Sequence, residues 1–162
     1  MEPSTGPEYR VRGFEQGDLP KLESMYRSFE PLGGAKGLPP LREEKTARWL
    51  RILGDRGHTL VALDSTGSLI GHAVLADSAE GEAELAVFIH QACRAKGLGT
   101  RLARGMVQYA QRNGYRRVWA TVSPANTAAI RMVESCGFRT VPGGWSAELD
   151  LELWLQEKKN SE

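Results

Sequence analysis

The stretch from Glu84 to Thr100 decides the fold: Glu-Leu-Ala-Val-Phe-Ile-His runs from 84 to 90, and Gln-Ala-Cys-Arg-Ala-Lys-Gly-Leu-Gly-Thr follows from 91 to 100. The first part predicts a strand, and apolar residues at helical spacing follow the second. Gly97 and Gly99 stand between strand and helix, where glycine lets backbone amides approach a ligand closely. Free N–H groups at a helix N-terminus favour an anion, so the loop predicts a pyrophosphate site.

Two common phosphate loops do not fit this stretch. A Walker A loop ends in Gly-Lys-Ser/Thr, whereas this loop ends in Gly99-Thr100. A dinucleotide-binding fingerprint needs a third small residue where Leu102 stands, and an acid about 20 residues further on. After this loop, the first acidic residue along the chain is Glu134.

Periodicity outside this stretch predicts one α/β domain. We expect strands near 9–14, 58–64, 68–76, 82–90, 117–122 and 145–154. We expect helices from about 18, over 42–53, from 98 to a stop at Gly114, and from Asn126 to Gly137, with a Gly- and Pro-rich loop over 30–40. The order βααβββαβαβ implies a mixed, mostly antiparallel sheet over residues 9–155, between a flexible arm (1–8) and a flexible tail (156–162).

Composition narrows the class of protein. A chain of 162 residues with 41% hydrophobic and 25% charged residues is that of a single globular domain. No apolar run is long enough to span a membrane, and the first eight residues do not resemble a secretory signal, so we expect a cytoplasmic protein. Cys93 and Cys136 predict free thiols, and the three histidines lack zinc-site spacing, so no metal is expected.

The distribution of charge is more informative than its sum. A net charge of +1 argues against nucleic-acid binding. Four acids lie between Asp77 and Glu84, whereas the stretch from Leu85 to Val133 contains none. That stretch holds eight cations: Arg94, Lys96, Arg101, Arg104, Arg112, Arg116, Arg117 and Arg131. The asymmetry favours a polyanionic ligand beside a cationic one, and a solvated basic surface is the alternative.

Two motifs together resemble the GNAT superfamily of acetyl-CoA-dependent N-acetyltransferases. Arg94-x-x-Gly97-x-Gly99 resembles its pyrophosphate loop, and Asn126-x-x-Ala129-Ile130 followed by Glu134-Ser-Cys-Gly-Phe138 resembles its second cofactor motif. The resemblance covers about residues 11–153. Within the superfamily, Ala83-Glu84-Leu-Ala, the loop over 29–40 and the helix from Arg42 look like the catalytic domain of bacterial Pat-type protein lysine acetyltransferases.

This resemblance implies an acyltransferase that uses acetyl-CoA and releases coenzyme A. Backbone amides near Val87 and Ile89 would pair with the pantetheine arm, and one at Val87 or Phe88 would polarise the thioester carbonyl. Asn126 would cap its helix, contact the cofactor, or both. The implied cofactor-binding residues are Val87, Phe88, Ile89, Arg94, Ala95, Lys96, Gly97, Leu98, Gly99, Thr100 and Asn126.

Direct attack by an amine, without a covalent enzyme intermediate, needs a base. Glu82 and Glu84 share one face of their strand, and neighbouring carboxylates raise one another's pKa. Glu84 stands where Pat-type and histone-type members carry their base, so we expect Glu84 to act and Glu82 to be the reserve. The alternative is that both are solvated acids of an edge strand.

The sequence departs from the family pattern at Val133, where many members carry the tyrosine that protonates the leaving thiolate. Water or the thiolate itself can handle that proton. Cys93, His72 and His90 are possible substitutes, although packed or surface positions are the simpler interpretation for each.

The same resemblance implies that the acceptor is a primary amine, either a protein lysine or a small molecule, and it leaves a homodimer open. A non-catalytic acyl-CoA-binding or sensing module is the alternative from another class. A phosphate-binding interaction domain is a third possibility.

Overall fold

A computed structural model describes residues 8–30, 57–94, 97–142 and 148–156. Seven strands form one sheet in the order β1-β2-β3-β4-β5-β7-β6. Among the described strands only β4 and β5 pair in parallel, and the other neighbours are antiparallel. The predicted mixed, mostly antiparallel sheet is therefore confirmed. The strands are β1 (Arg10–Gly13), β2 (Gly57–Leu63), β3 (Leu69–Ala79), β4 (Glu82–Ile89), β5 (Arg117–Val122), β6 (Arg139–Thr140) and β7 (Leu149–Trp154).

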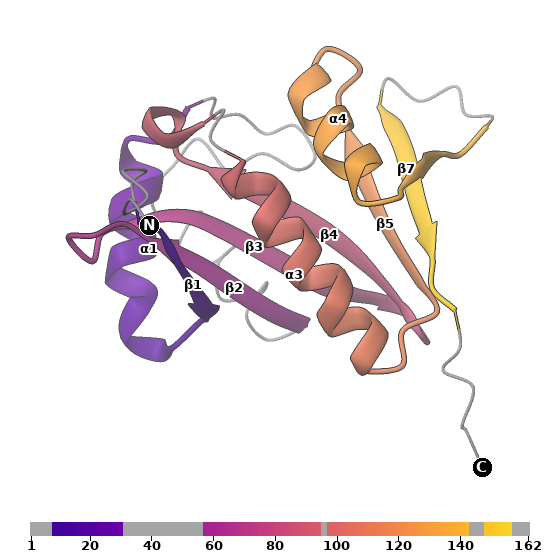
Figure 1. The fold of residues 1–162 in the computed structure, drawn as a ribbon, viewed down its shortest axis with the longest axis horizontal. Helices are drawn as coiled ribbons and strands as arrows, with labels where there is room; N and C mark the ends of the chain where they lie inside the picture. Colours follow the sequence, from indigo (N-terminus) through magenta and orange to yellow (C-terminus); the bar gives the residue numbers. More distant parts are fainter. Residues whose placement is uncertain (1–7, 31–56, 95–96, 143–147, 157–162) are drawn as a thin grey trace, which may run out of the picture.

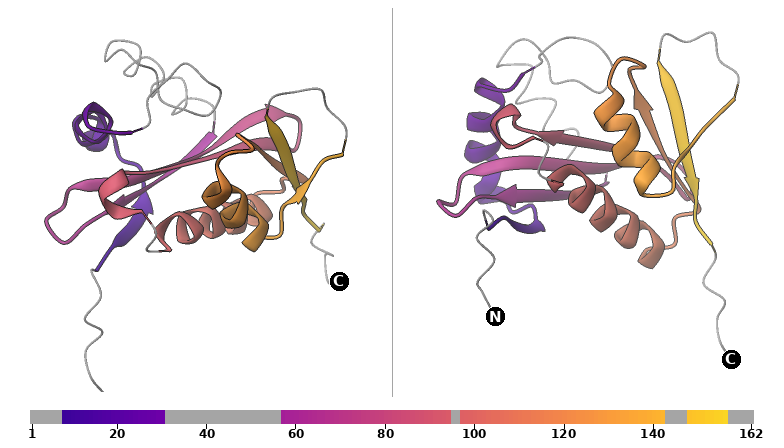
Figure 2. Two further views of the ribbon diagram at one scale, coloured as in Figure 1. Left: turned by 90° about the horizontal axis from the view of Figure 1, so that it is seen from above. Right: turned by 45° about the horizontal axis from the view of Figure 1, so that its top comes forward.

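Helices cover both faces of this sheet. Figure 2 shows α1 on one face and α3 and α4 on the other. The described helices are α1 (Leu19–Arg27), α3 (Leu98–Arg112) and α4 (Thr127–Ser135), with 3-10 turns η1 (Gln16–Asp18) and η2 (Gln91–Cys93). None of these described helices is long and apolar enough to cross a membrane. The predicted helix over 42–53 lies outside the described residues, as do nearly all of the predicted loop, arm and tail.

The two faces of the sheet have separate apolar cores, because successive strand residues point to opposite sides. The residues under α1 include Leu22, Met25, Tyr26, Phe29, Val61, Leu63, Leu69 and Phe88. A larger core under α3 and α4 includes Leu75, Leu85, Leu98, Leu102, Met106, Val118, Val133, Phe138 and Leu151. The alternation along β4 therefore places Ala83 and Leu85 in the larger core, and Glu82 and Glu84 on the α1 face.

Two features of the sheet, the length of β3 and the presence of β6, differ from those predicted. β3 continues to Ala79, because its polar end pairs with Glu82, Ala83 and Glu84 across the hairpin. The two-residue strand β6 is too short to show alternation, and it forms by pairing with β7. Gly114 and Gly137 follow α3 and α4 as predicted, with φ of 77° and 97°, the left-handed conformation that ends a helix.

The parallel pairing between β4 and β5 is short. It joins Glu82 to Arg117, Ala83 to Val118 and Glu84 to Trp119. β4 continues to Ile89 and β5 to Val122, and the two strands diverge beyond this pairing (Figure 1). Beyond Glu84, the edge of β4 that faces β5 is therefore not paired with that strand.

Candidate active site

The N-terminus of α3 has the geometry of an anion site. Gly97 precedes the helix with φ of 76°, and no side chain of the described residues caps this end. The first helical bond runs from the Arg101 amide to the Gly97 carbonyl at 3.1 Å. The amides of Leu98, Gly99 and Thr100 precede that bond, so helix geometry leaves them without intrahelical acceptors.

Close packing fixes the position of this helix end. A Cβ built on Gly99 would lie 2.9 Å from Met132 Sδ on α4 and 3.6 Å from Ile89 Cγ1 on β4. Gly97 has open space around it, so its positive φ, and not crowding, makes glycine the suitable residue there. Glycine is therefore required at 99 because of the limited space, and at 97 because of the backbone conformation.

Arg94 does not project freely toward the loop. Its Nε donates to the Ile89 carbonyl at 2.9 Å, its Nη2 donates to the Glu30 carbonyl, and its Cζ lies 5.3 Å from the centre of the Phe29 ring. The guanidinium thus joins the loop over 91–100, called the cofactor loop below, to the residues that follow α1. Ala95 and Lys96 lie outside the described residues.

The three strand residues proposed for the pantetheine arm could act only through their backbone. Phe88 is 4% exposed in the core under α1. Val87 and Ile89 pack against the core under α3 and α4. All three lie beyond the last pair with β5, where β4 has an edge for another chain of hydrogen bonds.

Asn126 lies at the start of α4, on the element after β5. Its Oδ1 accepts a hydrogen bond from the Ala129 amide at 3.1 Å, which confirms the predicted cap. The residue is exposed, so a cofactor contact would come in addition to the cap.

Glu82 and Glu84 share a face, as predicted, but their surroundings differ. Arg117 Nη1 lies 3.5 Å from Glu82 Oε2, and Arg117 Nε lies 2.7 Å from Glu152 Oε2 on β7. Glu84 is half-buried and pairs in register with Ala76 on β3 and Trp119 on β5. Glu82 thus already has a cationic partner, and Glu84 stands at the last position before β4 and β5 separate.

Comparison with known proteins decides the family. The acetyltransferase (GNAT) family profile matches residues 20–138, which include most of α1, the cofactor loop and α4. The chain belongs to the GNAT family. This family uses acetyl-CoA, and the protein is an acyltransferase.

Named relatives of this GNAT protein act on different amines. An L-methionine sulfoximine/L-methionine sulfone acetyltransferase of Pseudomonas aeruginosa is 25% identical over 79% of this chain and 78% of its own length. A phosphinothricin acetyltransferase from Sinorhizobium meliloti in complex with acetyl-CoA superimposes with a TM-score of 0.74 at 23% identity, over 91% of this chain and 88% of that one. The ribosomal-protein-S18-alanine N-acetyltransferase from Escherichia coli gives 0.73 at 19% identity, over 95% and 98%. The structural likenesses show the fold alone.

Of the three candidate proton donors of this GNAT domain, His72 and His90 are engaged in other hydrogen bonds. Val133 is 2% exposed in the core under α3 and α4. His72 is buried, its Nδ1 lies 2.9 Å from Tyr26 Oη, and burial lowers the pKa of His72 to about 3. His90 Nδ1 accepts from the Ala92 amide, and its Nε2 lies 2.9 Å from Ser28 Oγ. Cys93 is a half-buried free thiol.

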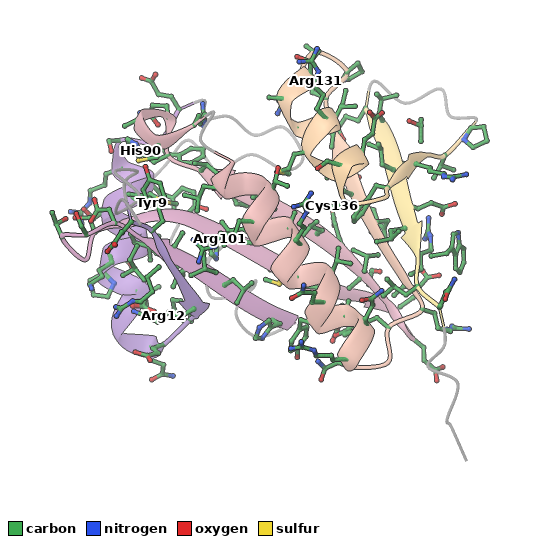
Figure 3. All side chains as sticks on the ribbon, viewed as in Figure 1. Tyr9, Arg12, His90, Arg101, Arg131 and Cys136 are labelled. Carbon is green, nitrogen blue, oxygen red and sulfur yellow. The ribbon has the colours of Figure 1, made fainter. Side chains whose placement is uncertain are left out.

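The eight cations do not form one surface around the cofactor loop. Arg117 lies on the other face of the sheet with Glu82 and Glu152, and Arg116 donates to the Glu80 carbonyl. Arg101 and Arg131 lie well apart on α3 and α4 (Figure 3). The expectation that the whole acid-free stretch holds phosphates is therefore wrong for Arg116 and Arg117, because adjacent strand and loop residues point to different sides.

The sequence argument missed Trp119, and it considered Arg117 only as one of eight cations that could face a polyanion. Arg117 and Trp119 alternate along the predicted strand 117–122, and that period would have placed them together on one face. What the sequence could not show is the parallel pairing that sets this face beside Glu82 and Glu84. Among the described residues, no group of three or more His, Cys, Asp or Glu side chains could hold a metal ion.

Proposed function

We propose that this GNAT protein transfers the acetyl group of acetyl-CoA directly to a primary amine, with Glu84 as the general base. The observation that carries the proposal is the position of Glu84 at the last β4–β5 pair. A carboxylate there lies beside the point where the strands part, on the α1 face of the sheet. Glu82, held by Arg117, is the reserve.

The residues present suit acetyl-CoA. The uncapped amides at Gly97, Leu98, Gly99 and Thr100 would hold the pyrophosphate, and the edge of β4 at Val87, Phe88 and Ile89 would hold the pantetheine arm. The shape and positive charge of the loop would come from Arg94, Ala95 and Lys96. Asn126 would contact the cofactor from the start of α4. Acetyl-CoA, when bound, supplies an acetyl group as an activated thioester.

The chemistry required of the protein is a proton transfer and a polarised carbonyl. An alkylammonium has no lone pair, so Glu84 accepts one proton and leaves a neutral amine. A β4 amide near Val87 donates to the carbonyl oxygen on which negative charge develops. With valine at 133, a coenzyme A thiolate departs without a tyrosine donor, and water returns the proton.

For the acceptor we propose a small-molecule amine. The support is the Pseudomonas aeruginosa relative, whose named acceptors are amino-acid analogues and which matches most of this chain. The resemblance of Ala83-Glu84-Leu-Ala and its neighbours to Pat-type enzymes instead favours a protein lysine. Both acceptors present an ammonium group to Glu84, so the same base serves either.

The test is release of coenzyme A thiol from acetyl-CoA with a panel of amines. Methionine sulfoximine, methionine sulfone and phosphinothricin form one arm, and lysine peptides form the other. Turnover with the first arm supports the proposal, and turnover only with peptides moves the acceptor class to protein lysines. Tight binding of acetyl-CoA without turnover in either arm would contradict the proposal. Sedimentation of the same samples tests the predicted homodimer.

A further inference from the structure

The side chain of Arg94 turns back to the end of β4. Arg94 follows the 3-10 turn η2, and its Nε donates a hydrogen bond to the Ile89 carbonyl at 2.9 Å. Its Nη2 donates to the Glu30 carbonyl, and its Cζ lies 5.3 Å from the centre of the Phe29 ring. Two of the five N–H donors of the guanidinium are therefore occupied by backbone carbonyls of the protein itself.

Hydrogen bonds at the two ends of β4 show which way the Ile89 carbonyl points. The His90 amide donates to the Ile70 carbonyl on β3 at 2.9 Å, and the Arg117 amide on β5 donates to the Gly81 carbonyl at 3.2 Å. Along a strand, the backbone groups of successive residues point alternately to the two neighbouring strands. Because His90 faces β3, Ile89 faces the side of β5, and Gly81, eight residues before Ile89, agrees with this alternation.

The edge of β4 on the side of β5 is open at this point. The parallel ladder ends at the pair of Glu84 and Trp119, and beyond it β4 faces no described strand on this side. The backbone groups of Val87 point the same way as those of Ile89, by the same alternation. Arg94 thus occupies the last acceptor of this edge. Within the described part of the chain, the Ile89 amide and both backbone groups of Val87 remain available to a ligand.

Packing holds the start of α3 in place independently of Arg94. A Cβ on Gly99 would lie 2.9 Å from Met132 Sδ and 3.6 Å from Ile89 Cγ1, and Leu98 is 3% exposed. The amides that would bind the pyrophosphate belong to this helix end. We therefore expect loss of the Arg94 side chain to change the edge of β4 and to leave the pyrophosphate site in place.

We propose that Arg94 is a positioning residue for the pantetheine arm and not a phosphate ligand: by holding the Ile89 carbonyl, it fixes the end of the β4 edge and directs the arm to Val87. This inference rests on the proposed place of the arm along Val87 and Ile89. An arm bonded to the Ile89 carbonyl would be displaced by two residues, about 7 Å, from one bonded to the Val87 carbonyl. The Arg94 side chain stands in the place of that displaced bond.

Three substitutions separate the hydrogen bond of Arg94 from its charge. In Arg94→Gln the amide nitrogen stands as far along the side chain as Nε does in arginine, so it can donate to the Ile89 carbonyl without a positive charge. In Arg94→Lys the charge remains, and a methylene stands at the place of Nε. Arg94→Met removes both the donor and the charge. Because Arg94 is exposed, we expect all three variants to fold.

The experiment measures how much affinity the arm adds. ADP carries the pyrophosphate without the arm, and dephospho-coenzyme A carries both, so the ratio of their Kd values from calorimetry isolates the arm. We expect this ratio to stay within about twofold of the parent in Arg94→Gln and to fall about five- to tenfold in Arg94→Lys and Arg94→Met, because an unfixed edge must be ordered when the arm binds. The Kd for ADP itself should stay close to the parent value in all three variants.

The comparison of Arg94→Gln with Arg94→Lys decides the proposal. Parent-like binding in Arg94→Lys, with weakened ADP binding in Arg94→Gln, would show that Arg94 binds phosphate. An equal loss of affinity for ADP and dephospho-coenzyme A in all three variants would show that Arg94 only secures the loop. Any result in which Arg94→Gln lies no closer to the parent than Arg94→Lys overturns the positioning role.

A second readout separates this inference from the proposed place of the arm. In the parent, dephospho-coenzyme A should shift the NMR amide signals of Val87 and Ile89, and ADP should not. In Arg94→Lys the shift at Val87 should shrink. Absence of the shift in the parent would show that the arm binds elsewhere, and the inference about Arg94 would fall with it. A normal shift in the parent, with Arg94→Gln and Arg94→Lys behaving alike, would overturn the role of Arg94 alone.

Discussion

Met132 on α4 lies where a side chain at Gly99 on α3 would project: a Cβ on Gly99 would be 2.9 Å from Met132 Sδ. The contact ties the start of α3 to α4 and to Ile89 on β4. Gly97, two residues earlier, is constrained by its φ of 76° instead. The loop therefore depends on one glycine for space and on the other for conformation.

Substitutions at these glycines should weaken acetyl-CoA binding for different reasons. Gly97→Ala forces a left-handed conformation that costs about 1–2 kcal/mol, so we expect Kd to rise roughly tenfold. Gly99→Ala should cost less, because the methionine thioether can shift, and Gly99→Ala/Met132→Ala should recover affinity. Calorimetry measures both, with Gly13→Ala on β1, which has open space, as the matched control. Native affinity in Gly97→Ala and in Gly97→Pro would show that the pyrophosphate binds elsewhere.

Coenzyme A binding should weaken as salt rises, with only part of the basic stretch responsible. Arg101 lies in the first turn of α3, whereas Arg112 lies about 16 Å further along the helix. At 0.1 M salt exposed charges are screened over about 10 Å. Arg101→Gln should flatten the salt dependence of Kd, and Arg112→Gln should leave it unchanged. Dephospho-coenzyme A should bind less tightly than coenzyme A. Equal slopes in both variants and the parent would contradict this assignment.

Gln91 holds the cofactor loop to the end of α1. Its Nε2 donates to the Ser28 carbonyl, and its Oε1 accepts from the Glu30 amide at 3.0 Å. Gln91→Ala removes both bonds, each worth about 1 kcal/mol, and the loop must then be ordered when the cofactor binds. We expect Kd for acetyl-CoA to rise about five- to tenfold, while Gln111→Ala on the exposed side of α3 serves as the control. An unchanged Kd in folded Gln91→Ala would mean that the loop keeps its shape without this contact.

The buried pair of Tyr26 and His72 should make stability depend on pH. Burial lowers the pKa of His72 to about 3, whereas an unfolded histidine titrates near 6.5. Below pH 6.5 the histidine therefore binds a proton in the unfolded chain but stays neutral in the folded protein. The free energy of unfolding should be at its full value above pH 6.5 and fall by up to about 1.4 kcal/mol per pH unit below it.

Urea unfolding between pH 7.5 and 5 measures this dependence. The double variant Tyr26→Phe/His72→Phe replaces both partners with apolar rings, so its curve should be flatter over this range. Parallel curves for the parent and the double variant would show that His72 takes up a proton in the folded state.

Most of the fold could be predicted from local patterns in the sequence. Gly97 and Gly99 marked the loop, Asn126 the start of α4, and Gly114 and Gly137 the helix ends, because each is a short-range backbone requirement. The period of two along β4 placed Glu82 and Glu84 on one face.

The contacts that could not be predicted from the sequence depend on tertiary pairing. The ion pair between Arg117 and Glu82 joins residues 35 positions apart, and it depends on the parallel contact of β4 with β5. The turn of Arg94 toward Glu30 depends on where α1 ends. Neither contact follows from a local period, and charge counting alone grouped Arg117 with the expected phosphate ligands.

The central claim is that Glu84 accepts the proton of the acceptor amine. Glu84→Gln keeps the shape of the side chain and removes its basicity, so kcat should fall by roughly 10²–10⁴ while acetyl-CoA affinity stays nearly unchanged. Glu82→Gln is the matched control and should cost much less, because Glu82 is paired with Arg117.

The most direct measurement is kcat for Glu84→Gln and Glu82→Gln across pH, with acetyl-CoA binding measured on the same samples. We expect the Glu84→Gln rate to recover partly as pH rises, since free amine then forms without the enzyme. Equal small losses of kcat in the two variants, with no pH rescue in Glu84→Gln, would contradict the account and leave the carboxylates of this face only a steering role.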